Sequence, residues 1–153
     1  NCDIDYMFPD NEEVVLIRGL KRRVQELGWN TIVRGCVKEP INDAITNAKM
    51  NNIKNDHFFC NDASVFMKNM ASKKEKVDVV VMYTPRKGSD EKFLNAVIKL
   101  SPKKVIYISC DPRTQVVDLK YLLDNDYIIN AIQPVDMFPH TSHVENIVIL
   151  SHK

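Results

Sequence analysis

Short apolar segments alternate along this chain with segments of helical periodicity, and this alternation restricts the fold more than any other feature. The run at residues 77–83, VDVVVMY, and the run at residues 103–109, KKVIYIS, are almost continuously apolar, as in strands of a parallel sheet that is covered on both faces. Each run is followed by a segment with helical spacing, over residues 89–100 and 112–125. The pattern predicts an α/β domain with a doubly wound, mostly parallel sheet.

The same pattern extends toward both ends of the chain. The two strand-like runs at residues 127–138 and 144–152 have no helix between them, so we expect them to pair antiparallel at one edge of the sheet. Further strands are expected at residues 13–19, 30–36 and 57–63, and further helices at residues 20–28, 39–52 and 64–70.

Three expected helices have recognisable starts and apolar faces. Pro40 and Pro112 stand in a first helical turn, where a missing N–H costs nothing, and Ser89 is a candidate N-cap. The expected buried faces are Ile41, Ala44, Ile45 and Ala48 in the first helix, Phe93, Leu94, Val97 and Ile98 in the second, and Val116, Leu119 and Leu123 in the third.

Composition sets broad limits on the class of protein. A chain of 153 residues, with 44% hydrophobic and 27% charged residues, is typical of one globular domain, so we expect a single domain over residues 1–153. The net charge of +1 neither predicts nor excludes a nucleic-acid partner. The four cysteines form no CxxC pair, which opposes a zinc ribbon or a thioredoxin-type motif. Cys36, Cys60 and Cys110 each lie at or near the end of an expected strand, which favours reduced thiols and a cytoplasmic location. No run approaches the roughly 20 apolar residues of a membrane span, so no membrane partner is expected.

Polar residues follow several of the expected strands, and ligands of open α/β sheets bind outside the carboxyl ends of the strands. Cys110 lies between a strand and a helix that begins near Asp111 and Pro112, and the partial positive charge at a helix N-terminus favours the reactive thiolate. Arg113 would add to this effect and Asp111 would oppose it. Cys110 is therefore a candidate nucleophile, and the alternative is a strand-end cysteine that only packs.

A second polar group stands in FPHTSHVE, between the last two expected strands. His140, His143 and Glu145 could be metal ligands, but a spacing of this kind in a loop is weak support, and we expect no metal. Glu145, which begins a strand, could instead be a general base in a half-buried cleft. The alternative is a glutamate that faces solvent on an edge strand.

Two long segments resemble one enzyme family. YISCDPRTQVVDL, at residues 107–119, and QPVDMFPHTSHVENIVIL, at residues 133–150, resemble the C-terminal half of the RNA 5-methyluridine (uracil-5-) methyltransferases, which modify transfer RNA or 23S ribosomal RNA. The segments at residues 38–63 and 84–88 are also similar to the family, so the resemblance covers about residues 31–153. It implies a Rossmann-like class I methyltransferase sheet, mostly parallel, with an antiparallel C-terminal hairpin.

The resemblance also implies a reaction and its residues. Cys110 would be the thiolate that adds to carbon 6 of uridine, which makes carbon 5 nucleophilic toward the methyl group of S-adenosylmethionine. Glu145 would be the base that removes the carbon-5 proton. Arg86, Arg113 and His140 are the expected RNA contacts, with an ordinary surface role as the alternative for the two arginines.

The expected cofactor side departs from the family pattern. The family's glycine-rich first turn is replaced by VVLIRGLKRR, in which Gly19 is the one glycine. Gly35 stands where the family has an acid for the ribose hydroxyls, and Tyr83 replaces the acid of its Asp-Pro-Pro-Arg loop. Asp62 keeps the acid expected near the adenine, and Pro85 keeps part of the loop, so Gly19, Asp62 and Pro85 are the expected cofactor contacts.

Three functions follow as hypotheses. The first is an S-adenosylmethionine-dependent RNA (uracil-5-)-methyltransferase domain, and the second is an inactive methyltransferase-like domain that is retained for RNA or protein binding. The third is a Rossmann-like domain of another class, which both catalytic motifs oppose. Residues 1–30 are divergent and the N-terminal RNA-binding domain of the family is absent from this sequence, so other domains of a longer chain are possible partners.

Overall fold

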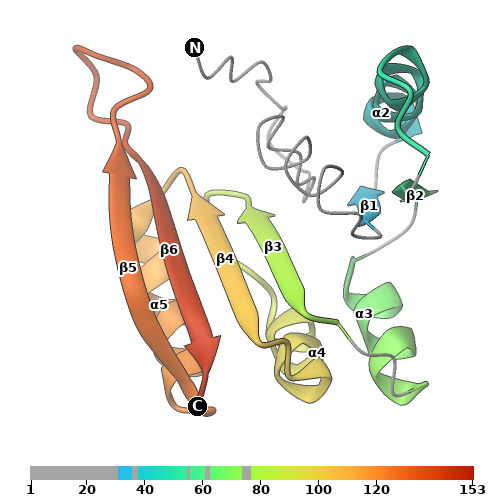
Figure 1. Cartoon of the computed structure of the whole chain (residues 1–153). Helices are drawn as coiled ribbons and strands as arrows, with labels where there is room; N and C mark the ends of the chain where they lie inside the picture. Colours follow the sequence, from blue (N-terminus) through green and yellow to red (C-terminus); the bar gives the residue numbers. More distant parts are fainter. Residues whose placement is uncertain (1–30, 36–37, 55, 61–62, 74–76) are drawn as a thin grey trace. The chain divides into compact units, whose positions relative to one another are not determined.

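The protein forms two compact units, Asn1–Ala63 and Ser64–Lys153. The strand expected at residues 13–19 and the helix expected at residues 20–28 lie outside the part of the chain that the structure describes. The computed structural model, drawn in Figure 1, describes residues 31–35, 38–54, 56–60, 63–73 and 77–153.

The described part of the first unit is a βαβ arrangement. Strands β1 (Thr31–Gly35) and β2 (Asp56–Cys60) pair in parallel, and helix α2 (Lys38–Met50) connects them, as the sequence predicts. The apolar face of α2 is also as expected, with Ile41, Ala44 and Ala48 buried and Ile45 half-buried.

The second unit contains a four-stranded sheet. Its strands are β3 (Val79–Thr84), β4 (Lys104–Ser109), β5 (Tyr127–Val135) and β6 (Glu145–His152), in the spatial order β3-β4-β6-β5. β3 and β4 are parallel, whereas β6 is antiparallel to both β4 and β5. The predicted antiparallel pair is thus present, with β6 inside the sheet and β5 at its edge. Pro134 lies in β5, where an edge strand tolerates the missing N–H.

The described part of this unit also contains the helices α3 (Ala63–Ser72, of which Ala63 belongs to the first unit), α4 (Glu91–Leu100) and α5 (Pro112–Leu123). Helices α4 and α5 lie behind the same face of the sheet in Figure 1. No helix in the described ranges has the length and apolar character needed to cross a bilayer.

The N-cap of α4 is Asp90, and the prediction of Ser89 is wrong by one residue. The Asp90 carboxylate accepts a hydrogen bond from the backbone N–H of Phe93 at 2.7 Å. A carboxylate also interacts favourably with the positive end of the helix dipole, which a hydroxyl does not.

The two faces of β3 and β4 are buried to different degrees. On the face toward α4 and α5, alternate residues are buried: Val80, Met82 and Thr84 in β3, and Val105, Tyr107 and Ser109 in β4. The residues between them are half-buried, apart from the exposed Lys104 at the start of β4. Both faces are therefore covered in the described structure, but the face toward α4 and α5 is covered more completely than the other.

The buried face of α5 is rotated from the predicted one. Leu119 is buried as expected, but Val116 and Leu123 are exposed by 62% and 37%. The face that contacts the sheet consists of Gln115, Asp118, Leu119 and Leu122. Two polar residues can occupy it because their side chains are hydrogen-bonded there, as described below.

Candidate active site

The ends of three neighbouring strands lie close together at one end of the four-stranded sheet. β3 and β4 terminate there and β6 begins there (Figure 1). In the register of the sheet, Thr84 pairs with Ser109, and Ser109 pairs with Asn146. Tyr83, Cys110 and Glu145 each lie one residue from this row.

Strand alternation places these three side chains on one face of the sheet. Tyr83 pairs with Ile108, which pairs with Ile147, and this row belongs to the half-buried face away from α5. Cys110 is two residues beyond Ile108 and Glu145 is two residues before Ile147, so the two-residue period carries both toward the face of Tyr83. All three residues are partly buried.

The electrostatics of Tyr83 indicate the same proximity. The pKa of its phenol is raised well above the ordinary value, first by burial and then by the negative charges of Glu145 and Cys110. A side-chain hydrogen bond with Cys110 raises the pKa further, and the positive charge of Arg86 opposes the shift. Tyr83 is therefore a protonated donor at neutral pH, next to the thiol and near the carboxylate.

Glu145 occupies a half-buried position at the start of β6. Burial raises the pKa of its carboxyl above the ordinary value, because the charged form loses solvation. A carboxylate with a raised pKa is a stronger base than one in water, which is the property that proton removal from carbon requires.

Cys110 directly precedes the N-cap of α5, as predicted. Asp111 is this cap, and its carboxylate accepts a hydrogen bond from the Arg113 backbone N–H at 3.0 Å. The Arg113 guanidinium donates to both carboxylate oxygens, at 3.0 and 2.8 Å. These bonds lower the pKa of Asp111 to about 2, so Asp111 is charged at neutral pH. Arg113 thus pairs with Asp111, while most of its side chain is exposed.

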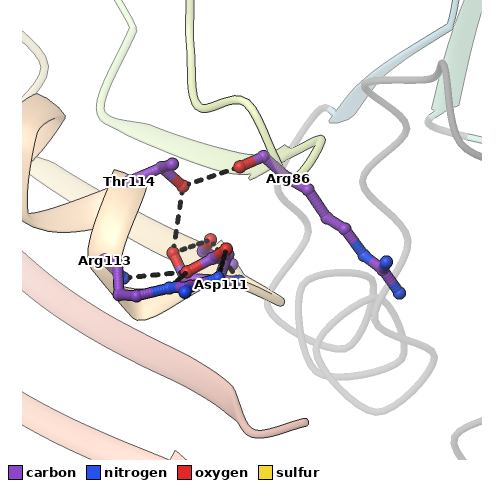
Figure 2. Close-up of polar contacts among 5 residues, drawn as sticks. Arg86, Asp111, Arg113 and Thr114 are labelled. Carbon is purple, nitrogen blue, oxygen red and sulfur yellow. Dashed lines mark hydrogen bonds and ion pairs between the residues drawn. The ribbon is translucent and has the colours of Figure 1, made fainter.

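The loop after β3 is fastened to the first turn of α5. The Thr114 hydroxyl donates to the backbone oxygen of Arg86 at 2.9 Å and lies 3.1 Å from that of Asp111. Figure 2 shows these contacts, with the Arg86 guanidinium directed away from them. Arg86 is exposed, and its positive charge acts to lower the pKa of Tyr83.

A buried polar network holds the other end of this loop. The Asp118 carboxylate accepts from the Tyr107 phenol at 2.6 Å and from the Ser89 backbone N–H at 2.7 Å. Since the single phenol proton points to Asp118, the Thr84 hydroxyl is the donor in its 2.9 Å bond with Tyr107. Gly88 has φ +82°, and a Cβ there would lie 3.1 Å from Asp118. The loop therefore needs a glycine at this position.

Gln115 links α5 to the start of β6. Its amide nitrogen donates to the backbone oxygen of Tyr107 at 3.1 Å and that of Asn146 at 3.3 Å. Its amide oxygen accepts from the Asn146 side chain at 2.7 Å. Because Asn146 follows Glu145, the fully buried Gln115 fixes the backbone beside the candidate base.

The other predicted site residues have different outcomes. Pro85 is half-buried directly after β3, whereas Gly19 and Asp62 lie outside the described residues. His140 is exposed in the loop between β5 and β6, with φ 68°. Within the described ranges, no three His, Cys, Asp or Glu side chains come together as metal ligands, so His140, His143 and Glu145 do not form such a group.

Sequence reasoning missed the importance of Tyr83, Gln115 and Asp118. The sequence alone shows Tyr83 only as the loss of an acid. Gln115 and Asp118 share helical spacing with Leu119 and Leu122, which is a signal that polar groups stand on an apolar face.

Comparison with known proteins identifies the family. The sequence model described as tRNA (Uracil-5-)-methyltransferase matches residues 30–153. The chain belongs to this uracil-5 methyltransferase family. An uncharacterized RNA methyltransferase of Bacillus cereus is 44% identical over 115 residues, which cover 75% of this chain and 25% of that relative. One from Bacteroides thetaiotaomicron is 42% identical over 115 residues, again 25% of its length. The chain therefore spans about a quarter of the curated relatives it matches.

Solved structures agree with this family assignment. The tRNA (uracil-54, C5)-methyltransferase of Pyrococcus abyssi, in complex with S-adenosyl-L-homocysteine, has a TM-score of 0.67 and 28% identity, covering 82% of this chain and 29% of that one. NSun6 from Pyrococcus horikoshii has a TM-score of 0.68 at 15% identity, covering 88% and 45%, which supports the fold alone. The prediction of a Rossmann-like methyltransferase fold, with parallel and antiparallel strands, is confirmed.

Proposed function

We propose that this chain is the catalytic part of an S-adenosylmethionine-dependent RNA methyltransferase that acts on carbon 5 of uridine. The observation that supports it best is that Cys110 and Glu145 lie on one face at the same end of the sheet, where both influence the half-buried phenol of Tyr83. A nucleophile and a base at one sheet edge are what this reaction needs, and the family assignment names the reaction. Additional domains and a cytoplasmic location stay predictions.

Cys110 is the proposed nucleophile. Its thiolate would add to carbon 6 of the uracil ring and push the ring electrons into an enolate, which makes carbon 5 nucleophilic. The position before the Asp111 cap supports this role, because the helix N-terminus favours negative charge. The target base would have to leave its stack to reach the sulfur.

Glu145 is the proposed base. After carbon 5 has gained a methyl group, the carboxylate would take the carbon-5 proton, the ring double bond would re-form, and the Cys110 thiolate would leave carbon 6. The burial that raises the pKa of Glu145 supports this role. Arg86, Arg113 and His140, all exposed, are proposed as RNA contacts.

The chain fits the cofactor in part. S-adenosylmethionine, when bound, supplies the methyl group as an electrophile on sulfonium. Gly35, at the end of β1, has no carboxylate for the ribose hydroxyls. The residues that would hold the cofactor are Gly19, Asp62 and Pro85, and the loop of Pro85 is fastened by hydrogen bonds of Thr114 and Asp118.

Trapping with 5-fluorouridine RNA tests the nucleophile. The chain is incubated with S-adenosylmethionine and this RNA, and a covalent adduct is sought on a denaturing gel. Fluorine cannot leave carbon 5 as a proton does, so the adduct should persist in the unsubstituted chain and in Cys60→Ala, an exposed control cysteine. Cys110→Ala should form none. An adduct in Cys110→Ala, or none in the unsubstituted chain with RNA binding intact, would remove the assignment.

An inactive domain that binds RNA or protein is the second candidate function. Gly35 and Tyr83 favour it, because each stands where the family pattern has an acid. Calorimetric titration with S-adenosylmethionine distinguishes the two candidates. Heat of binding at millimolar cofactor is expected for an active domain, and no heat at that concentration would favour the inactive one.

A further inference from the structure

Gln115 is a fully buried polar side chain to which the proposed mechanism gives no role. It lies near the start of α5, and its amide reaches two strands of the sheet. The amide nitrogen donates to the backbone oxygens of Tyr107 on β4 and Asn146 on β6, at 3.1 and 3.3 Å. The amide oxygen accepts from the Asn146 side chain at 2.7 Å. Asn146 is therefore bound to this amide through both its backbone and its side chain.

Glu145 stands at the end of a strand, where its position depends on the neighbouring residue. It is the first residue of β6 and pairs with Val135 of β5. The pairing of β6 with β4 begins one residue later, with Asn146 opposite Ser109. Strand ends open more readily than strand centres, so a terminal side chain is placed by the nearest residue that is held firmly. For Glu145, this residue is Asn146.

The edge strand β5 cannot hold Asn146 in the way that Gln115 does. The residue of β5 opposite Asn146 is Pro134, which has no backbone N–H to donate. The Gln115 amide instead supplies a donor to the Asn146 backbone oxygen from α5. Because the same amide binds the Tyr107 backbone, it connects the start of β6 to β4 as well as to α5.

The candidate nucleophile is held in a different way. The Ser109 hydroxyl accepts from the Asp111 backbone N–H at 3.1 Å and donates to the Asp111 backbone oxygen at 3.2 Å. These local bonds span Cys110 and do not use the Gln115 side chain. Loss of the Gln115 amide should therefore displace Glu145 more than Cys110.

We propose that Gln115 is a positioning residue for Glu145: its amide fixes Asn146, and thereby keeps the Glu145 carboxylate within reach of carbon 5 of a uracil that is bonded to Cys110. The proposal rests on the proposed function and names the residue that supports its last step. In that step the carboxylate takes the carbon-5 proton, the electrons of the C–H bond re-form the ring double bond, and the bond from carbon 6 to the Cys110 sulfur breaks.

The test is a single turnover with S-adenosylmethionine and an RNA of ordinary uridine. The methylated covalent adduct and the released methylated RNA are quantified over time on a denaturing gel. Gln115→Met keeps the approximate size of the side chain and removes its hydrogen bonds. We expect the adduct to form and its release to slow about ten- to a hundredfold, because the base is displaced from the proton. Asn146→Ala should slow release less, because the bond to the backbone oxygen at position 146 remains.

Tyr121→Phe is the matched control, because it removes another hydrogen bond of α5, that to Asn95 of α4 at 2.9 Å. Its release rate should equal that of the parent. The ratio of adduct to released RNA separates positioning from a purely structural role, since unfolded molecules yield neither species. Release at the parental rate in Gln115→Met would overturn the proposal, as would equal slowing in Tyr121→Phe. If Gln115→Met does not fold, parental release in Asn146→Ala overturns it.

Two further readouts distinguish this proposal from the proposed function. With 5-fluorouridine RNA, Gln115→Met should form the adduct as the parent does. Backbone amide hydrogen exchange, which needs neither RNA nor cofactor, should become faster in Gln115→Met at residues 145–147 and stay unchanged at residues 109–111. If the parent forms no adduct but this difference is seen, the proposed reaction fails and the positioning of Glu145 by Gln115 stands. If the adduct forms and exchange does not change, the reaction stands and the role of Gln115 fails.

Discussion

Tyr107 and Tyr83 lie on neighbouring strands of one sheet, yet they have opposite surroundings. Tyr107 faces α5, is fully buried, and shares its hydroxyl between Asp118 and Thr84. Tyr83 faces the other side, is half-buried, and has Glu145 and Cys110 among the groups that raise its pKa. Because side chains alternate along a strand, adjacent residues of β3 can belong to a rigid scaffold and to a reactive surface.

The difference shows how one sheet can provide a rigid scaffold on one face and a reactive surface on the other. On the α5 face, the side chains of Asp118, Thr114 and Gln115 are hydrogen-bonded, which stabilises the loop after β3 and the start of β6. On the other face, Glu145 is held with a raised pKa, an arrangement that costs stability and favours reactivity. Substitutions on the first face should therefore destabilise the fold, and substitutions on the second should not.

The largest effect is expected from Asp118→Ala. It removes the acceptor of the Tyr107 phenol and of the Ser89 backbone N–H, both in a buried setting. We expect the free energy of unfolding to fall by about 3–4 kcal/mol, measured by urea denaturation. Asp124→Ala, at the exposed carboxylate of the residue directly after α5, should change it by less than about 0.5 kcal/mol. Equal losses in the two variants would contradict the scaffold role of Asp118.

A smaller effect is expected from Gly88→Ala. The residue has φ +82°, and the new Cβ would approach the Asp118 carboxylate to 3.1 Å. We expect a loss of about 1–2 kcal/mol in the same denaturation experiment. Lys87→Ala, on the exposed part of the loop, serves as the control and should be nearly neutral. A Gly88→Ala variant as stable as the parent would mean that the loop does not need the left-handed conformation.

The smallest effect, of opposite sign, is expected from Glu145→Gln. Because folding raises the pKa of Glu145, the folded chain binds this proton more tightly than the unfolded chain. The parent therefore loses stability as the pH rises from the unfolded pKa, near 4.3, through the folded one. Glu145→Gln lacks this loss, so it should melt at a higher temperature at neutral pH, and the gap should close on acidification.

Glu91→Gln is the control for this comparison, since Glu91 is exposed in the first turn of α4. A gap between Glu145→Gln and the parent that stays constant with pH would contradict the raised pKa. In an RNA with ordinary uridine, the same Glu145→Gln variant should accumulate the methylated adduct, because proton removal is blocked.

The strands were predictable, because apolar runs bounded by polar residues mark β3 and β4 closely. The antiparallel pairing of β5 and β6 was also expected, whereas the position of β6 between β4 and β5 was not. The face of α5 was not, because residues 116, 119 and 123 have helical spacing as good as residues 115, 118, 119 and 122. The choice between them depends on hydrogen bonds of Gln115 and Asp118 to other elements, which no local pattern contains.

The candidate site, too, was predictable only in part. Cys110 could be placed from local signals, a strand end followed by an aspartate and a proline, and its closeness to Glu145 was expected from the family resemblance. The surroundings of Tyr83 could not be predicted, because Cys110 follows β4 and Glu145 begins β6, and these residues become its neighbours only through the register of the sheet.

The position of β6 between β4 and β5 has a consequence for how the chain is made. During synthesis on a ribosome, β5 emerges before β6, and until β6 follows it has no neighbour in its final sheet. The hydrogen-bonding groups of β4 and β5 are then unpaired on the sides that β6 will fill, and exposed strand edges of this kind invite association between nascent chains. Pairing of β6 with both strands ends that exposure, and it also brings Glu145 to its position in the candidate site.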